Sequence, residues 1–277
     1  MTRSAKTAQR DIRLVLADVD GTLVTPEKEL TEETRSAARQ LSQAGIMLAL
    51  TSGRPPRGMR MFIEPLSLQG TIAGFNGGVF VNPDLSVIES HVLDPAIARQ
   101  AHDLLLGQGL DVWVYTDTAW LVRDMNAPRV AREAWTVKFD AEVVASFTEE
   151  HLARAAKLVG VSDDHDLVAA AEKAVQAALG GKASASRSQP YYLDVTHPQA
   201  NKGAVVSTLA RLSNISPQQI ATIGDMPNDV LMFNKSGFSI AMGNASEAVK
   251  AQASAVTDSN ENEGFAKAMR TFILPAA

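Results

Sequence analysis

The 277-residue sequence contains no cysteine. This absence excludes disulfides, thiolate nucleophiles, and zinc or iron–sulfur sites built on cysteine. The chain also lacks a long basic run, and 26 lysines and arginines against 31 acidic residues give a net charge of −5. A surface that binds nucleic acid by neutralising its phosphates is therefore not expected. A chain without cysteine suits the reducing cytoplasm, where we expect this protein to reside.

Long apolar runs are absent as well. The apolar runs 14–17 and 46–50 have the length of strands, far below the roughly 18 residues that span a bilayer. Met1–Arg10 carries three basic residues but no apolar stretch with a cleavage site, so we interpret it as a solvated tail. We expect no membrane partner, and a monomer or a weak homodimer.

Several common catalytic patterns do not occur. The sequence has no Gly-x₄-Gly-Lys, Gly-x-Ser-x-Gly or Gly-x-Gly-x-x-Gly pattern. It therefore gives no support for nucleotide-driven, serine-hydrolase or dinucleotide-binding chemistry. The five histidines also lack a spacing typical of zinc ligands, so a zinc site is not expected.

The composition is that of a globular protein, with 45% hydrophobic and 21% charged residues. Short apolar runs alternate with amphipathic stretches near both ends of the chain, which indicates parallel strands joined by helices. The middle is mixed: Asp94-Pro95 predicts a helix start, and 112–115 with 120–122 predict an antiparallel hairpin. The predicted strands of the two ends are 12–17, 46–50, 220–223 and 238–241, and the predicted helices begin at Thr31, Asn201, Ser216 and Asn228.

This pattern predicts an α/β fold of two domains, since 277 residues exceed one comfortable core. Residues 1–83 and 191–277 would form a doubly wound parallel sheet, and residues 84–190 an inserted α+β domain. The linkers between the two domains would lie near Asn82–Asp84 and Gln189–Pro190.

Two acidic clusters follow predicted strands. Asp18 and Asp20 come directly after the first buried strand, and Asp225 and Asp229 follow the strand 220–223 with Gly224 between. Asp and Gly are also common turn formers, so each cluster alone is a modest signal. Parallel strands place their carboxyl ends at one edge of the sheet, where ligands bind. Carboxylates gathered there repel one another unless a cation lies between them, and Mg²⁺ prefers such oxygen ligands.

Two further polar groups lie at element ends. Ser52 follows the strand 46–50 and can hydrogen-bond a phosphoryl oxygen, although it could instead be the N-cap of a helix. Lys202 begins a predicted helix and offers a point charge to the same oxygen, although it could be an ordinary exposed lysine. These alternatives do not explain why the acids, the hydroxyl and the lysine all occur at element ends in this order.

This order of motifs resembles the haloacid dehalogenase-like phosphatases, and within them the Cof-type subfamily (class IIB) with an α/β cap inserted between the second and third motifs. The resemblance rests on Asp18-x-Asp20-Gly-Thr, Ser52-Gly-Arg, Lys202-Gly and Gly224-Asp225-x-x-Asn228-Asp229. Smaller matches occur at Asn76-Gly77-Gly78, Gly243-Asn244 and Asn260 with Glu263. The two end segments match well, and the middle matches by position and element order.

The resemblance implies a Mg²⁺-dependent phosphatase of small phosphorylated metabolites, with sugar phosphates expected first. Asp18 would be the nucleophile that forms an aspartyl-phosphate, and Asp20 the general acid and base. Asp18, Asp20, Asp225 and Asp229 would hold the metal. The phosphate would be bound by Gly21, Thr22, Ser52, Gly53, Arg54, Lys202 and Asn228.

Two residues depart from the family pattern. Ser52 stands where relatives usually have threonine, and it keeps the hydroxyl, with Thr51 as the neighbouring alternative. Pro227 lies inside the second acidic cluster, where it suits the first turn of a helix. Neither departure removes a charged group that the chemistry needs.

Other functions fit parts of the pattern. A phosphomutase or phosphotransferase uses the same first half-reaction, and hydrolysis in ¹⁸O-water would distinguish it. A receiver-type signalling domain also combines acids, a hydroxyl and a lysine, but such domains are about half this length. A non-catalytic phosphometabolite-binding protein remains, although Asp18 and Asp20 are both present.

The substrate itself is not predicted by these motifs. The inserted domain would set specificity, and its candidate contacts are Trp113, Tyr115, Trp120 and Arg123 on the predicted hairpin. Aromatic residues on strands also serve packing, which is the alternative role for the three rings. Arg54 and Asn76 are further candidates for substrate or cap contacts, or for a salt bridge and a turn.

Overall fold

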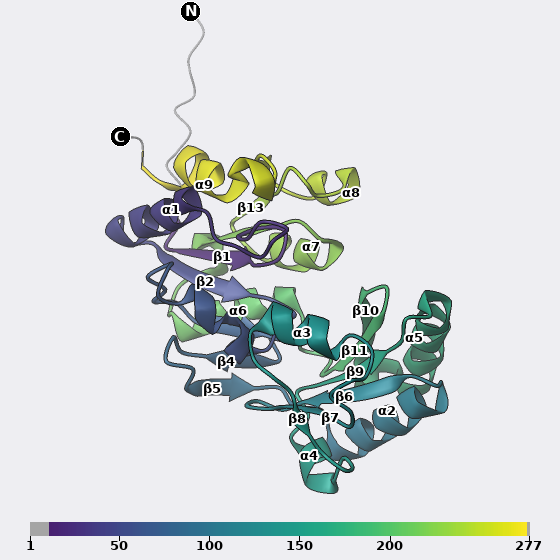
Figure 1. The fold of residues 1–277 in the computed structure, drawn as a ribbon. Coiled ribbons are helices and arrows are strands. Elements are labelled where there is room, and N and C mark those ends of the chain that lie inside the picture. The colour runs from purple at the N-terminus through teal and green to yellow at the C-terminus, as the bar shows by residue number, and fades with distance from the viewer. Residues whose placement is uncertain (1–10, 276–277) are drawn as a thin grey trace, which may run out of the picture. The chain divides into compact units, whose positions relative to one another are not determined.

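The computed structural model describes residues 11–275, which form two compact units (Figure 1). The first unit comprises residues 11–50, 64–70 and 206–275, and the second comprises residues 51–63 and 71–205. The predicted solvated tail, Met1–Arg10, lies outside the described residues. The predicted division into a core, 1–83 with 191–277, and an insertion, 84–190, stays a prediction.

The first unit is built on a sheet in which β14, β13, β12, β1 and β2 are successive neighbours. β1 pairs in parallel with β12, β12 with β13, and β13 with β14. The α/β fold with a parallel sheet is therefore confirmed, and the carboxyl ends of β1 and β12 lie side by side. The strands span Ala255–Val256, Phe238–Ala241, Ile220–Gly224, Leu14–Asp18 and Met47–Thr51, in the order given above.

The helices of this unit follow from local sequence signals. α1 (Glu32–Gln43) begins at Thr31, whose hydroxyl accepts a hydrogen bond from the Thr34 amide at 3.1 Å, as the sequence predicts. The helix ends before Gly45, which has a φ of +73°. Ala37, Ala38 and Leu41 are its buried face. The other helices of this unit are α7 (Val230–Phe233), α8 (Glu247–Lys250) and α9 (Gly264–Ala268), and α6 (Lys202–Leu212) belongs to it from Val206 onward.

The second unit is built on a six-stranded sheet with the order β10-β11-β9-β6-β7-β8. Neighbouring strands are antiparallel except for β7 and β8, so the predicted hairpin of β6 and β7 is confirmed. The strands span Ser184–Gln189, Tyr192–Thr196, Lys157–Val161, Asp111–Tyr115, Trp120–Val122 and Glu142–Val143, in the same order.

One face of this sheet packs on helices α2 (Pro95–Gly107), α4 (Glu149–Ala153) and α5 (His165–Leu179). Leu105, Leu152 and Val168 from these helices share a buried apolar cluster with Val114 and Leu158 of the sheet. Asp94 caps α2 and accepts hydrogen bonds from the Ala96 and Ile97 amides, as predicted. The same unit contains α3 (Val130–Val137), β3 (Ile72–Gly74), β4 (Val79–Val81) and β5 (Val87–Ser90).

The structure refines several sequence predictions of local structure. Asn82–Asp84 lies in the hairpin turn that joins β4 to β5, and Gln189 is the last residue of β10, with Pro190 in the turn to β11; the domain linkers near these residues stay a prediction. Ser216-Pro217 begins a single 3₁₀ turn rather than a helix. The predicted helix at Asn228–Phe233 is confirmed in position: a 3₁₀ turn, Pro227–Asp229, leads directly into the short α7, which ends at Phe233. Between residues 11 and 275, no helix has both the length and the apolar character that crossing a bilayer requires.

Candidate active site

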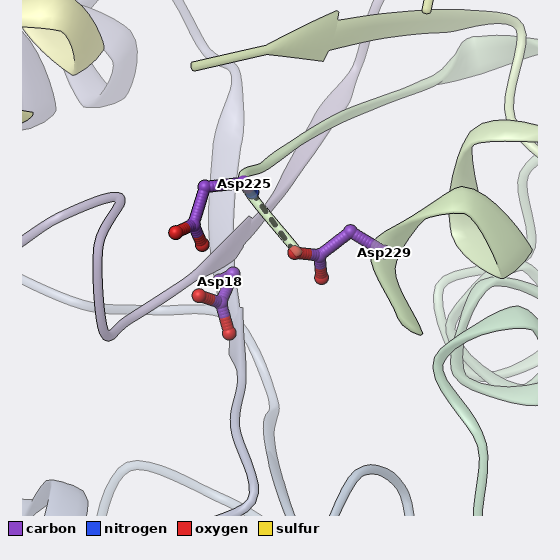
Figure 2. A group of neighbouring side chains, drawn as sticks. All are labelled: Asp18, Asp225 and Asp229. Carbon is purple, nitrogen blue, oxygen red and sulfur yellow. Dashed lines mark hydrogen bonds between the residues drawn. The ribbon is translucent and has the colours of Figure 1, made fainter. Parts of the chain in front are cut away.

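Three aspartates meet at the carboxyl ends of β1 and β12. Asp18 is the last residue of β1, and Asp225 directly follows β12. Asp229 lies one turn further on, at the end of the 3₁₀ turn. Each of the three offers a carboxylate oxygen, and these oxygens lie within 4.8 Å of one another (Figure 2). The sequence prediction that the two acidic clusters come together is confirmed for these three residues.

Hydrogen bonds within the second cluster fix its shape. The backbone amides of Asp225 and Met226 both donate to Oδ2 of Asp229 at 2.9 Å, and Figure 2 shows the first of these bonds. Asp229 is fully buried and Asp18 is 5% exposed. Unit charges about 4 Å apart interact by about 4 kcal/mol in the partly screened environment near a protein surface. Three carboxylates at this separation are therefore unfavourable when all are ionised and no cation is present.

Glycines leave room for the carboxylates. A Cβ atom on Gly21 would lie 2.3 Å from Oδ2 of Asp225, and the φ of Gly21 is +83°. Gly21 belongs to a turn in which the amides of Thr22, Leu23 and Val24 all donate to the Val19 carbonyl. The Thr22 amide nitrogen is 3.3 Å from the Val19 carbonyl oxygen. This hydrogen bond of the turn competes with the predicted bond from the same amide to phosphate.

Asp20 lies two residues beyond Asp18 and is partly exposed. Its Oδ1 is 2.8 Å from Nζ of Lys28, and the two side chains are 34% and 26% exposed. Lys28 has a φ of +66° and belongs to a turn closed by its amide bond to the Thr25 carbonyl.

Asn244 and Asn260 occur in motifs that match the family pattern, and the sequence predicts no role for either. In the structure, both support the acidic cluster through hydrogen bonds. The Asn244 side-chain amide donates to the Gly21 carbonyl at 2.9 Å and to Oδ2 of Asp225 at 3.1 Å. Asn260 donates its backbone amide to Oδ1 of Asn244 and its side-chain amide to the Val24 carbonyl. The signal available in the sequence was the Gly243-Asn244 pair just after a predicted strand. These bonds orient Asp225 and the loop that follows Asp18.

The donor set fits a hard divalent cation. All three clustered side chains supply carboxylate oxygens, and no cysteine or histidine belongs to the group. Mg²⁺ is bound in proteins by a few carboxylates together with water and phosphate oxygens. The small residue at Gly21 keeps the space beside Asp225 open, since a Cβ would fill it. Asp18, Asp225 and Asp229 could therefore hold Mg²⁺.

The second unit contains Ser52, Gly53 and Arg54, in the loop directly after β2. Ser52 is buried; its amide donates to the Ala73 carbonyl at 3.1 Å and its Oγ accepts from the Arg54 amide at 3.2 Å. The Arg54 guanidinium is also buried, donates to the Thr136 carbonyl at 2.9 Å and stacks over the Phe62 ring. Arg54 thus has structural bonds inside its own unit.

Other predicted site residues are found in both units. Lys202 is the first residue of α6 and is 3% exposed, so it is not an ordinary surface lysine. Asn228 lies exposed in the 3₁₀ turn between Asp225 and Asp229. Thr51, the alternative to Ser52, has a fully buried hydroxyl with no hydrogen-bond partner among the described residues.

The candidate cap contacts divide into two kinds. Trp113, Tyr115 and Trp120 are each 1% exposed and contact one another through their rings, which favours the packing role. Arg123 is exposed. Asn76 has a φ of +57° and donates its amide to the Ser52 carbonyl at 2.8 Å, so it serves the turn beside the Ser52 loop.

Comparison with known proteins gives consistent results. The family model of haloacid dehalogenase-like hydrolases matches residues 15–269. A 5-amino-6-(5-phospho-D-ribitylamino)uracil phosphatase from Bacillus subtilis is 25% identical, over 95% of this chain and 97% of that protein. A pyridoxal phosphate phosphatase from Escherichia coli is 25% identical, over 92% and 96%. The crystal structure of a haloacid dehalogenase-like hydrolase from Bacteroides thetaiotaomicron, 27% identical, superposes with a TM-score of 0.86 over 93% and 98%.

Proposed function

The chain belongs to the haloacid dehalogenase-like hydrolases, and from this membership we propose that it is a Mg²⁺-dependent phosphatase that forms an aspartyl-phosphate on Asp18. Its relatives are phosphatases of small phosphorylated metabolites. The observation that carries the proposal is the group of three carboxylates, Asp18, Asp225 and Asp229, at the ends of two neighbouring parallel strands. This group supplies a nucleophile and a set of metal ligands in one place.

In the first half-reaction a carboxylate oxygen of Asp18 attacks phosphorus, and the bond from phosphorus to the leaving oxygen breaks. Asp20 gives its proton to the leaving alcohol. In the second half-reaction Asp20 takes a proton from water as the water oxygen attacks phosphorus, which releases phosphate and restores Asp18. Mg²⁺, when bound by Asp18, Asp225, Asp229 and the Asp20 carbonyl, would neutralise the charge repulsion between nucleophile and phosphate.

The phosphate itself would be bound by residues assigned from the sequence motifs. Ser52, Lys202, Asn228 and the backbone amides of Gly21 and Thr22 would donate to the phosphoryl oxygens. Gly53 and Arg54 belong to the same binding loop as Ser52. Ser52 and Lys202 are both buried, at 2% and 3% exposed, in keeping with a role other than that of surface side chains.

The substrate class is a small phosphate monoester, and sugar phosphates are the first to test. The named relatives act on 5-amino-6-(5-phospho-D-ribitylamino)uracil and on pyridoxal phosphate, and both compounds belong in the same screen. In this proposal residues 84–190 form the cap that selects the substrate, and residues 1–83 with 191–277 form the catalytic core. The enzyme would work in the cytoplasm as a monomer or a weak homodimer.

Replacement of the nucleophile tests the proposal. We expect Asp18→Asn to abolish Mg²⁺-dependent release of nitrophenol from p-nitrophenyl phosphate, because an amide cannot act as the nucleophile. Asp140→Asn, at an exposed aspartate, is the matched control and should keep full activity. Thermal unfolding of both variants followed by circular dichroism checks that the fold is intact. Undiminished turnover in a folded Asp18→Asn protein would overturn the assignment.

A further inference from the structure

The face of the six-stranded sheet opposite helices α2, α4 and α5 is unusually polar for a buried surface. Side chains alternate between the faces of a strand, and the pairing puts Lys157 opposite both Tyr115 of β6 and Thr196 of β11. Asp194 and Tyr192 follow on the same face of β11. All five side chains are buried, with exposed fractions between 1% and 9%. The polar character of this face therefore does not come from contact with solvent.

Lys157 is the centre of this face. Its Nζ donates to Oδ2 of Asp194 at 3.2 Å and to the backbone carbonyl of Gly53 at 3.2 Å. The ammonium also lies over two rings, 5.1 Å from the centroid of Tyr115 and 5.5 Å from that of Phe75. Burial of a charged pair is unfavourable compared with apolar side chains of the same volume, so packing alone does not require a lysine here.

The bond to Gly53 reaches the loop that carries Ser52. The turn after β3 binds this loop on one side: the Asn76 amide donates to the Ser52 carbonyl at 2.8 Å, and the Phe75 amide to the Arg54 carbonyl at 2.9 Å. The carbonyl between these two, that of Gly53, accepts from Lys157. Three successive carbonyls of the loop are thus held, two by backbone amides and the middle one by a side chain from β9.

Other groups on the same face hold Lys157 in place. Asp194 is its counterion, and Tyr115, under the ammonium, donates its hydroxyl to Glu133 of α3 at 2.9 Å. Burial raises the pKa of the Glu133 carboxyl above its ordinary value, and the nearby Lys157 charge and the Tyr115 bond oppose that rise. The lysine therefore has few alternative positions for its ammonium.

From this geometry we infer that Lys157, supported by Asp194, is a positioning residue that fixes the Ser52-Gly53-Arg54 loop for phosphate binding. The inference rests on the proposed function, because it requires Ser52 to bind phosphate. Lys157 does not itself touch the substrate; it acts through the Gly53 carbonyl on the direction of the neighbouring Ser52 hydroxyl. Small displacements of a binding group are enough to lower turnover strongly.

A double-mutant cycle with Ser52 tests the inference. With p-nitrophenyl phosphate and Mg²⁺ we expect Lys157→Met to lower kcat/KM about tenfold in the wild-type background, mainly through KM. In a Ser52→Ala background the same change should lower kcat/KM less than about twofold, since the group that it positions is gone. Lys173→Met, at an exposed lysine of α5, is the matched control and should leave both values unchanged.

The outcomes separate the inference from the proposed function. Equal losses from Lys157→Met in both backgrounds would mean a general structural role and would overturn the inference alone. Full activity in Ser52→Ala would overturn the phosphate-binding role of Ser52, and the inference with it. Lys157→Met leaves Asp194 as a buried charge without its counterion, which is a known cause of misfolding. If Lys157→Met does not fold, the double variant Lys157→Met/Asp194→Asn, in which this charge is removed, replaces it in the cycle.

Discussion

Among single residues, Gly224 decides how closely Asp229 can approach Asp225. A Cβ atom on Gly224 would lie 2.3 Å from Cγ of Asp229, which is buried and accepts bonds from two backbone amides. We expect Gly224→Ala to displace this carboxylate and to weaken Mg²⁺ binding about ten- to hundredfold, the usual effect of disturbing the surroundings of a metal site. Activity measured against Mg²⁺ concentration gives the apparent affinity.

The control for this change is Gly107→Ala, because a Cβ at Gly107 meets nothing within 4 Å. An unchanged Mg²⁺ dependence in Gly224→Ala would contradict the packing argument. A loss of folding, seen by circular dichroism, would be followed by Gly224→Ala combined with Asp229→Gly, which restores the space; recovery of folding in this double variant would support the packing argument without a test of Mg²⁺ binding.

Asp20 is expected to matter most when the leaving group is poor. Asp20→Asn should lower turnover of an alkyl phosphate such as glycerol phosphate about 10²- to 10⁴-fold, the range of a lost proton transfer. Its effect on p-nitrophenyl phosphate should be at least tenfold smaller, because nitrophenolate leaves without a proton. Steady-state rates on the two substrates give the ratio, and equal losses on both would argue against the role of general acid.

The acidic residues of the site could be predicted from the sequence, but their support could not. Asp18, Asp225 and Asp229 follow short apolar strands, and the carboxyl ends of parallel strands meet at one edge. Asn244 acts through bonds to Gly21 and Asp225, which are distant in the sequence and become neighbours only in the folded sheet. The burial of Lys202 likewise depends on tertiary packing and has no local signal.

At the scale of elements, the Thr31 hydroxyl caps the first turn of α1. Thr31 accepts from the Thr34 amide and donates to Oε2 of Glu263 at 2.6 Å, so it joins the helix to the segment before α9. We expect Thr31→Ala to lower the free energy of unfolding by about 1 kcal/mol, the typical cost of losing an N-cap. Urea unfolding measures the change, and Thr31→Ser should recover most of it. Equal stability of the alanine and serine variants would contradict the capping role.

Elements with clear boundary signals were predicted well, and those without were missed. β13 matches its predicted bounds, and the Asp94 and Thr31 caps are observed. β3 and β4 have three residues each, which is too short for a periodic pattern. α3 begins after Arg129, where a capping Ser, Thr, Asp or Asn would signal a helix start, and it ends before Lys138, where glycine would signal a helix end. Arg129 and Lys138 both have positive φ, and neither residue type predicts a helix boundary.

For the molecule as a whole, the proposed Mg²⁺ site at the three clustered carboxylates would link metal binding to stability. A ligand that binds the folded state alone adds about 2.7 kcal/mol when its concentration is a hundred times its Kd. We therefore expect MgCl₂ to raise the thermal unfolding temperature relative to EDTA. In Asp225→Asn the rise should be much smaller, since one of the three charges is gone.

Differential scanning calorimetry in EDTA and in MgCl₂ measures this shift for both proteins. Asp140→Asn, which removes an exposed charge elsewhere, should respond to Mg²⁺ as the wild type does. A shift of the same size in Asp225→Asn would mean that Mg²⁺ acts by general ionic effects and would contradict the site.

The pairing of β1 with β12 has a consequence for how the chain folds during synthesis. Leu14 lies opposite Ile220, about 200 residues later in the chain, so β1 leaves the ribosome long before this partner exists. Contacts of such long sequence separation slow folding and leave an apolar strand edge open in the meantime. The strands β6 to β11, which lie within 111–196, find their partners much sooner. Nascent chains that stop before Ile220 therefore lack the β12 partner of β1, which leaves one edge of this buried apolar strand unpaired.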